Sequence, residues 1–306
     1  MTVPTTILGQ NQYGKAENRV VKITRDGATH HIKDLNVSVA LSGDLDEVHY
    51  SGSNANVLPT DTTKNTVFAF AKEQGVESAE QFGIALARHF VDATEPISTA
   101  RIRVEEYAWE RIALAGGDAP HSFVRRGQEI RTAQITYDGA GVQVLSGLKG
   151  LTVLNSTDSE FWGYLKDGYT TLKEDYDRIL ATEVTAVWRH RSALAGSTGT
   201  GGWNASYEAV KQQMLRAFAE TYSLSLQQTL YRMGSQVLEN QPGLEEIRFS
   251  MPNKHHFKAD LEAFGIKNEA ADGAVYIAAD RPYGLIEATV LREGAEALIP
   301  TDMTNL

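Results

Sequence analysis

Residues 21–41 read VKITRDGATHHIKDLNVSVAL, and the periodicity of this stretch decides the fold. Val21 and Ile23 alternate with polar residues up to Asp26-Gly27, a dipeptide that favours a tight hairpin turn. After the turn, every second residue from Leu35 to Leu41 is apolar. Two strands of matched period joined by a turn dipeptide predict an antiparallel pair.

Downstream of this hairpin the apolar period becomes that of a helix. Ser78 and Gln81 match a capping box, and apolar residues then recur at helical spacing from Phe82 to Phe90. Two further strands are predicted at Ile102 to Trp109 and at Ile130 to Tyr137, joined by a connection that is long for a hairpin. The first half therefore contains two strands, a helical layer and two more strands.

The second half repeats this order. Asn204 is predicted to cap one helix, and a second helix is predicted from Leu226 to Val237, ending before Pro242-Gly243. The strands predicted around these helices are Val142 to Val153, Val184 to Trp188, Leu244 to Met251 and Leu285 to Leu291. The sequence thus predicts an α+β protein of two tandem ββααββ units, 1–140 and 141–306. Helices on one face of an antiparallel sheet leave open strand edges, which predicts an oligomer.

Composition excludes several classes of function. The chain has 306 residues, with 29 basic and 39 acidic side chains and a formal net charge of -10. No run of Lys or Arg is long enough to follow a nucleic-acid backbone. It has no cysteine, which excludes disulfides, thiolate nucleophiles and cysteine-containing zinc motifs. The N-terminus does not resemble a secretory signal, and no apolar stretch approaches membrane-spanning length. We therefore expect a cytoplasmic protein that binds neither nucleic acid nor membrane.

Common catalytic motifs are absent from the sequence. The glycine-rich segment 196–202 is not followed by Gly-Lys-Ser/Thr and is interpreted as a flexible loop. Neither a Gly-x-Ser-x-Gly elbow nor a His-Glu-x-x-His pair occurs. The doublets His30-His31 and His255-His256 do not indicate a metal site, because adjacent strand residues face opposite ways.

One strand end carries an unusual density of polar groups. Pro252-Asn253-Lys254-His255-His256-Phe257 places an amide, an ammonium and two imidazoles in four consecutive residues. In an extended segment Asn253 and His255 share one face, and Lys254 and His256 share the other. An amide beside an imidazole suits a small polar substrate that needs both recognition and proton movement. Taken alone, the segment is also compatible with a solvated strand end.

Several other segments, in order along the chain, carry a resemblance to a known family. They are Tyr13-Gly14-Lys15, Thr60-Asp61 with Lys64-Asn65-Thr66, residues 147–154, Phe161, Asp177-Arg178-Ile179-Leu180, Leu226-Gln227, Pro252-Asn253-Lys254-His255 and residues 280–284. Together they resemble the urate oxidase (uricase) family from about residue 9 to about residue 292. Each is weak alone, but the ordered set is specific.

The resemblance implies a fold, an assembly and a reaction. It implies the tunnelling fold (T-fold), in which each chain contributes two ββααββ units and a homotetramer encloses a barrel-like channel. It also implies oxidation of urate by dioxygen and water to 5-hydroxyisourate and hydrogen peroxide, with dioxygen as co-substrate and neither a metal nor an organic cofactor.

Substrate-binding residues are carried over position by position. Arg178, Gln227 and Phe161 match the family's cationic clamp, its amide and its stacking ring, three groups suited to a planar anion with a polar rim. By the same resemblance, backbone groups of Leu226 and Asp61 complete the rim of the site.

Catalytic residues are carried over in the same way. Lys15 and Thr60 match the catalytic dyad, and His255 matches the group that relays its proton. Asn253 matches the residue that holds dioxygen and later water above the purine plane. Thr60 and Asp61 are expected to come from a neighbouring subunit, so that the site lies at an interface.

The chain departs from the family pattern at a few places. Leu226 replaces a common valine, residues 191–203 and the tail after Arg292 do not align, and the terminal Thr304-Asn305-Leu306 is not a peroxisomal signal. This ending favours a bacterial, cytoplasmic protein. Two alternatives remain: a catalytically silent purine- or pterin-binding T-fold oligomer, and a metal-dependent pterin enzyme of the same fold.

Overall fold

The structure is a computed structural model that describes residues 6–193, 202–269 and 273–301. The chain divides into two compact units, one comprising Met1–Gly147 with Arg189–Ser206 and the other Leu148–Trp188 with Tyr207–Leu306. Residues 196–201 of the glycine-rich segment and 302–306 of the tail lie outside the described residues. The tandem units predicted at 1–140 and 141–306 stay a prediction.

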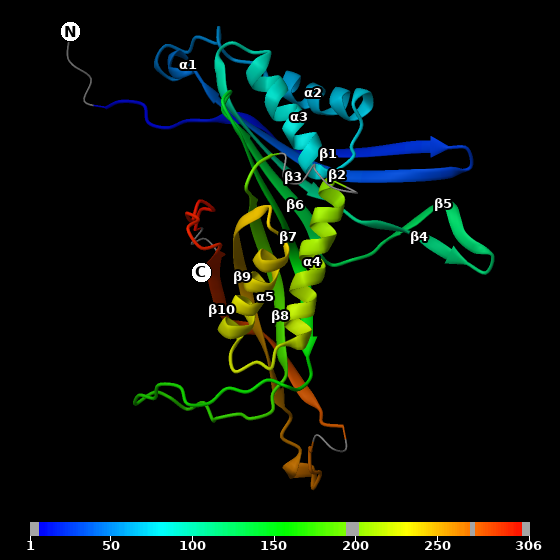
Figure 1. The fold of residues 1–306 in the computed structure, drawn as a ribbon, viewed down its shortest axis with the longest axis vertical. Coiled ribbons are helices and arrows are strands. Elements are labelled where there is room, and N and C mark those ends of the chain that lie inside the picture. The colour runs from blue at the N-terminus through cyan, green and yellow to red at the C-terminus, as the bar shows by residue number, and fades with distance from the viewer. Residues whose placement is uncertain (1–5, 194–201, 270–272, 302–306) are drawn as a thin grey trace. The chain divides into compact units, whose positions relative to one another are not determined.

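The first unit is built on a hairpin that opens an antiparallel sheet (Figure 1). Its strands are β1 (Tyr13–Asp26), β2 (Thr29–Gly43), β3 (Ile97–Glu106) and β6 (Ile130–Tyr137), hydrogen-bonded in that order. The predicted hairpin is confirmed, but its loop is Gly27-Ala28 because Asp26 already pairs with Thr29. Gly27 adopts a φ of 57°, a left-handed value that glycine takes without steric cost.

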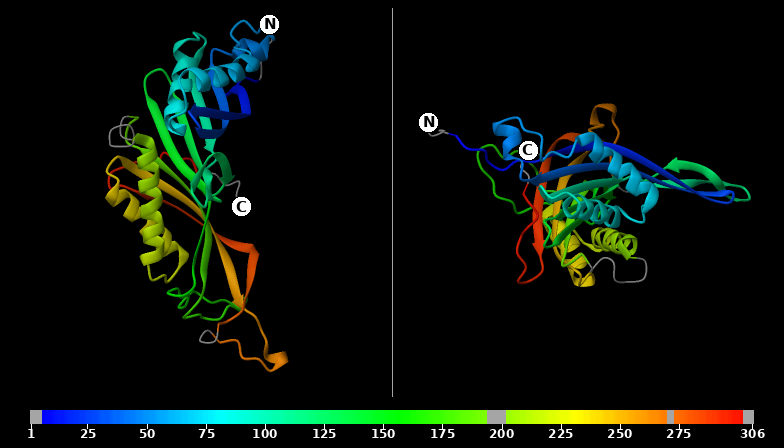
Figure 2. Two further views of the ribbon diagram at one scale, coloured as in Figure 1. Left: turned by 90° about the vertical axis from the view of Figure 1, so that its right-hand side faces the viewer. Right: turned by 90° about the horizontal axis from the view of Figure 1, so that it is seen from above.

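Three helices belong to this unit, and two of them pack on its sheet (Figure 2). They are α1 (Asp46–Tyr50), α2 (Thr60–Glu73) and α3 (Ala79–Asp92). The predicted start of α3 is confirmed, since Ser78 accepts a hydrogen bond from the backbone N–H of Gln81 at 3.1 Å. The reciprocal half of the capping box does not form: among the described residues, Oε1 of Gln81 has no hydrogen-bond partner.

The connection between β3 and β6 contains a hairpin of its own. Strands β4 (Trp109–Leu114) and β5 (Gly117–Arg125) form a separate two-stranded sheet. The prediction that one strand runs from Ile102 to Trp109 was therefore wrong at its end. Trp109 leaves β3's ladder because its backbone pairs with Arg125 and its indole N–H donates to Asp34 at 3.0 Å.

The second unit repeats strands, helices and strands. Its elements are β7 (Val142–Asn155), β8 (Leu180–His190), α4 (Gly202–Glu220), α5 (Leu226–Asn240), β9 (Leu244–Lys258), the 3-10 turn η1 (Glu262–Phe264) and β10 (Tyr276–Leu291). Three of them cross the boundary between the units: β7 and α4 begin in the first unit, and β8 ends there. The sheet order is β1-β2-β3-β6-β7-β8-β9-β10. Helix α5 packs on β9 and β10, and it ends before Pro242 as predicted.

Each unit has its own core, and period-two burial extends through both. In the first unit every second residue of β2 from Leu35 to Leu41 is buried against the helical layer. In the second, Ile247, Phe249 and Met251 of β9 are fully buried against the helices of that unit. The predicted α+β class, with helices on one face of an antiparallel sheet, is confirmed. Among the described residues no helix is long and apolar enough to cross a membrane.

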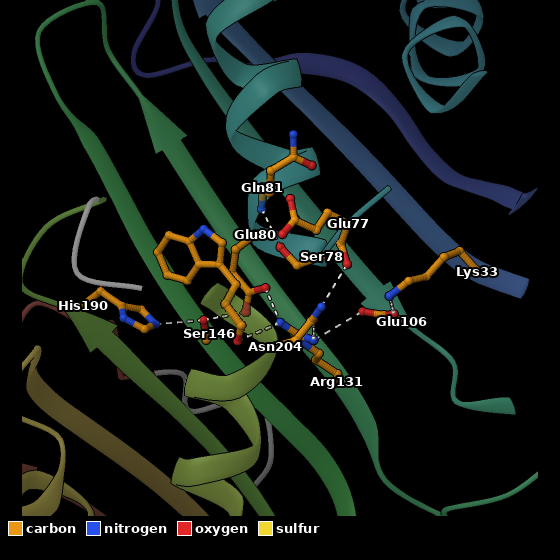
Figure 3. A network of polar contacts seen from close by, with 11 residues as sticks. Lys33, Glu77, Ser78, Glu80, Gln81, Glu106, Arg131, Ser146, His190 and Asn204 are labelled. Atoms are coloured by element: carbon orange, nitrogen blue, oxygen red, sulfur yellow. Dashed lines mark hydrogen bonds and ion pairs between the residues drawn. The ribbon is translucent and has the colours of Figure 1, made fainter. Parts of the chain in front are cut away.

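Asn204 does not cap α4 as predicted, because the helix already begins at Gly202. Its amide instead donates to the carbonyl of Glu77 at 3.1 Å and accepts a hydrogen bond from Arg131 at 2.6 Å (Figure 3). Side-chain bonds to a neighbouring segment therefore replace the local cap.

This contact belongs to a buried polar network in the first unit (Figure 3). Arg131 donates to one oxygen of Glu80 at 2.6 Å, and Ser146 donates to the other at 2.7 Å. Nε2 of His190 lies 2.9 Å from Oγ of Ser146. The hydroxyl proton of Ser146 is used for Glu80, so Nε2 of His190 is the donor in this contact. Burial lowers the pKa of His190 to about 4, so the imidazole is neutral at neutral pH. Mutual hydrogen bonding allows these polar groups to be buried.

Candidate active site

A cavity of about 590 Å³ lies in the second unit, where the start of α5 meets the end of β9. All six residues of the second half that the sequence predicted for the site line this cavity. They are Phe161, Arg178, Leu226, Gln227, Asn253 and His255. A pocket of this size is typical of small-ligand sites.

Strand β9 places two of these side chains at the cavity, because the alternation that buries its core residues continues toward its end. Met251 is fully buried, and Asn253 and His255 follow at steps of two and line the cavity. Both residues line one cavity, as the prediction that they share a face requires. His256 also lines the cavity, which alternation alone did not predict. The pairing of β9 with β10 shifts register opposite Lys254, and such an irregularity increases local twist.

Phe161 and Arg178 come from the two ends of one loop between β7 and β8. The backbone of Phe161 forms an antiparallel bridge with Asp175, with N···O distances of 2.7 and 3.0 Å. Arg178 donates its backbone N–H to the carbonyl of Ser159 at 2.8 Å and its Nε–H to the hydroxyl of Ser159 at 3.2 Å. These bonds join the loop ends and hold the two side chains together at the cavity.

The charge state of Arg178 is set by burial and by one carboxylate. Burial lowers the pKa of Arg178, and the negative charge of Asp175 partly offsets that shift. Arginine titrates so far above neutral pH that the guanidinium stays protonated. The cavity therefore holds a partly buried, permanent positive charge.

The N-terminus of α5 supplies backbone donors. Ser225 caps the helix by accepting from the N–H of Gln228 at 3.2 Å, so Leu226 and Gln227 occupy the first two helical positions. The N–H groups at these positions have no partner within the helix, and the helix dipole favours negative charge there. The side chain of Leu226 is buried in the core, so only its backbone can serve a ligand.

His255 is biased toward its neutral form. Burial lowers the pKa of His255, and the positive charges of Arg178 and His256 lower it further. The imidazole ring stacks on Phe257 with centroids 5.8 Å apart. A neutral imidazole at neutral pH can accept a proton, which a relay requires.

The remaining predicted residues lie in the first unit. Thr60 and Asp61 open α2, whose N-cap is Pro59, and Asp61 bonds Lys64 at 2.5 Å. The hydrogen bond from Lys64 and the positive charge of Lys64 are the main causes that lower the pKa of Asp61. The charge of Lys15 lowers it further. The charge of Lys15 therefore acts on the carboxylate of Asp61. Neither they nor Thr60 line the cavity of the second unit.

Sequence reasoning missed the residues that hold the recognition groups. Ser159 and Asp175 lie outside any motif, and their role depends on a bridge across a long loop. Phe257 could have been found, because it stands two residues after His255 and lines the same cavity.

The sequence of the chain is similar to those of known proteins. A family model described as Uricase matches residues 11–136 and 144–287. The uricase of Arthrobacter globiformis is 48% identical over 291 residues, covering 95% of this chain and 92% of that protein. The uricase of Aspergillus flavus is 36% identical over 294 residues, covering 94% of this chain and 97% of that protein.

Solved structures show the same fold. The crystal structure of uricase from Arthrobacter globiformis has a TM-score of 0.90 at 47% identity, covering 97% of this chain and 99% of that chain. A urate oxidase structure from Bacillus sp. TB-90 has a TM-score of 0.80 at 24% identity, which supports the fold alone. With a matching family model over most of its length and relatives at this identity, the chain belongs to the uricase family.

Proposed function

We propose that this protein is a urate oxidase. It converts urate, dioxygen and water to 5-hydroxyisourate and hydrogen peroxide: urate loses two electrons and dioxygen gains them. The observation that carries the proposal is the convergence of Phe161, Arg178, Gln227, Asn253 and His255 on one cavity in a member of the uricase family.

The cavity suits a flat purine anion. The ring of Phe161, which stacks on Tyr164 with centroids 4.9 Å apart, is the group assigned to stack on the purine. Arg178 offers paired, charge-assisted donors to the purine edge. Gln227 and the backbone at Leu226 face the opposite edge from the start of α5, where a helix terminus favours negative charge. Orientation and charge of the substrate are then fixed by separate groups.

Proton transfer is assigned to groups from both units. Urate must lose a further proton before it gives electrons readily to dioxygen, and Lys15 with Thr60 is the proposed base, with His255 as relay. Asn253 holds dioxygen, and later the attacking water, above the purine plane. Lys15, Thr60 and Asp61 belong to the first unit and do not line the cavity of the second. The resemblance to the family implies that a neighbouring copy of the chain supplies Thr60 and Asp61.

This arrangement needs an oligomer. We propose a homotetramer of chains with two tandem units each, 1–140 and 141–306, that encloses a barrel-like tunnel with a site at each subunit interface. Open strand edges in each unit are consistent with such pairing. A cytoplasmic location stays a prediction from the sequence.

No metal or organic cofactor takes part in the proposed reaction, because the substrate itself supplies the electrons once it is deprotonated. Among the described residues, no group of three or more His, Cys, Asp or Glu side chains could hold a metal ion. The experiment below decides this point.

Aerobic urate consumption after exhaustive chelation tests the proposal. Loss of the ultraviolet absorbance of urate, with release of one hydrogen peroxide per urate, is the expected result, and the reaction should stop without oxygen. Binding of urate without any change in absorbance would identify a silent purine-binding protein. Activity that is lost on chelation and restored by a divalent metal would identify a metal-dependent enzyme.

A further inference from the structure

Strand β1 changes which residues face the helices partway along its length. Before the change, Tyr13 faces the helical layer, and its hydroxyl accepts from the N–H of Leu58 at 2.9 Å. After the change, Lys22 faces it and donates to the carbonyl of Ala71 in α2 at 2.7 Å. Positions 13 and 22 differ by an odd number, so a regular strand would turn them to opposite faces.

A β-bulge accounts for the change. Lys15 pairs with Val39 and Asn18 pairs with Val37, so Ala16 and Glu17 together lie opposite the single residue between those partners. The extra residue resets the period, and Lys15 therefore lies on the same face as the buried core of the strand. The charge of Lys15 is one of the smaller causes that lower the pKa of Asp61 in α2.

Asn18 fastens the bulge. It is only 6% exposed, and its amide donates to the carbonyl of Lys15 at 3.1 Å and to the carbonyl of Val37 at 2.8 Å. Both protons of the amide are thus used, one on each side of the bulge. The carbonyl that Asn18 holds belongs to the proposed catalytic lysine itself.

Glu17 adopts the conformation that the bulge requires. Its φ is 59°, a left-handed value uncommon for residues other than glycine, asparagine and aspartate. Its N–H donates to the hydroxyl of Ser38 at 3.0 Å, and its carboxylate accepts from the amide of Asn36 at 2.5 Å. An unfavourable backbone conformation that is held by several bonds often serves a function.

Gly14 restricts the chain on the other side of Lys15. A Cβ at this position would lie 1.9 Å from the carbonyl oxygen of Val39, so β1 and β2 approach too closely for any side chain. The backbone of Lys15 is therefore restricted on both sides: before it by Gly14, where no side chain fits, and after it by the hydrogen-bonded bulge.

We propose that the bulge at Ala16 and Glu17, fastened by Asn18, is the device that positions Lys15 for proton transfer. Asn18 is a positioning residue: it acts through the backbone of Lys15. The inference rests on the proposed function, because it assigns Asn18 to the lysine of the proposed dyad.

Asn18→Ala tests the fastening. We expect kcat for urate to fall about 10- to 100-fold, the scale typical of a misplacement near 1 Å. KM and the Kd of a non-oxidisable urate analogue should stay within twofold, and the solvent deuterium isotope effect on kcat should rise as proton transfer limits the rate. Asn155→Ala is the matched control: it also loses an amide–carbonyl bond, from Asn155 to Phe218 at 3.0 Å, but should leave kcat unchanged.

A second pair of variants tests the bulge without touching Asn18. Glu17→Asn and Glu17→Val both lose the carboxylate bond to Asn36, but only asparagine tolerates left-handed φ. We expect Glu17→Asn to retain kcat and Glu17→Val to lower it at unchanged analogue affinity. Deletion of Glu17 should restore the plain strand period, turn Lys15 to the other face and match Lys15→Met in turnover.

The outcomes separate this inference from the function on which it rests. If the unaltered protein does not oxidise urate, the proposed function fails. If the unaltered protein is active and Lys15→Met is not, but Asn18→Ala and Glu17→Val both retain kcat within twofold, the function stands and the positioning role is wrong.

Discussion

The guanidinium carbon of Arg178 lies 5.1 Å from the ring centroid of Phe161. A cation over an aromatic face at this distance is attracted by the ring. The same loop ends that hold these side chains are joined through Ser159 and Asp175. The same loop therefore positions both the charge and the aromatic ring. Replacement of either residue should change how the cavity binds a ligand.

Replacement of Arg178 should weaken ligand binding. Loss of a charge-assisted hydrogen bond costs about 1.5–3 kcal/mol, so Arg178→Ala should raise the Kd of a non-oxidisable urate analogue about 10- to 150-fold. Isothermal titration calorimetry measures this. Arg216→Ala, which removes an exposed arginine of α4, is the control and should bind normally. Equal affinities of the two variants would remove Arg178 from the binding site.

Replacement of Lys15 should separate catalysis from binding. Lys15→Met keeps an unbranched side chain, one atom shorter, but removes the proposed base, so turnover should fall by about 10²- to 10⁴-fold, the range of general base catalysis. Affinity for the analogue should stay within a few-fold. Steady-state kinetics and calorimetry on one preparation check both. Unchanged turnover would rule out the assigned dyad.

The titration of His255 should report its surroundings. Burial and the charges of Arg178 and His256 lower its pKa, so the ring should be neutral at neutral pH and gain a proton only in more acid solution. NMR of the imidazole protons follows this titration. Arg178→Gln should move the pKa of His255 upward, whereas Arg216→Gln should not. A pKa of His255 above 6.5 would contradict the described site.

His190 should make the protein sensitive to acid. Burial, assisted by the charge of Arg131, lowers its pKa from 6.5 to about 4. Between pH 6.5 and about 4 the unfolded chain binds a proton that the folded chain does not, so stability falls as pH falls. The loss contributed by His190 should reach about 2 kcal/mol at pH 5.

The test compares the unaltered protein with His190→Gln, which retains a donor for Ser146 but cannot titrate. The free energy of unfolding in urea, measured at pH 7 and at pH 5, should fall by about 2 kcal/mol less in the variant. The same pH dependence in both proteins would show that His190 is not the group responsible.

Local chemistry made much of the fold predictable. The hairpin before Leu41, the start of α3 at Ser78 and the end of α5 before Pro242 all follow from signals within a few residues. The predictions that were wrong concern residues whose partners are distant in the sequence. Asn204 has the chemistry of a cap, but bonds to Glu77 and Arg131 compete for its amide.

The candidate site was harder than the fold to predict from signals within a few residues. Alternation along β9 predicted that Asn253 and His255 share a face, but it did not predict that Phe161 and Arg178 reach the same cavity. That proximity depends on the path of a long loop, and only the ordered resemblance to a family indicated it. The bulge beside Lys15 has no sequence signal, since Glu17 is not a residue that favours left-handed φ.

Leu226 has two structural roles: its side chain is buried in the core, and its backbone lies at the first position of α5, at the edge of the cavity. A substitution at this position is therefore limited by the volume of the buried side chain. Another aliphatic side chain of similar volume should therefore fit there and leave the backbone group that we assign to the substrate in place.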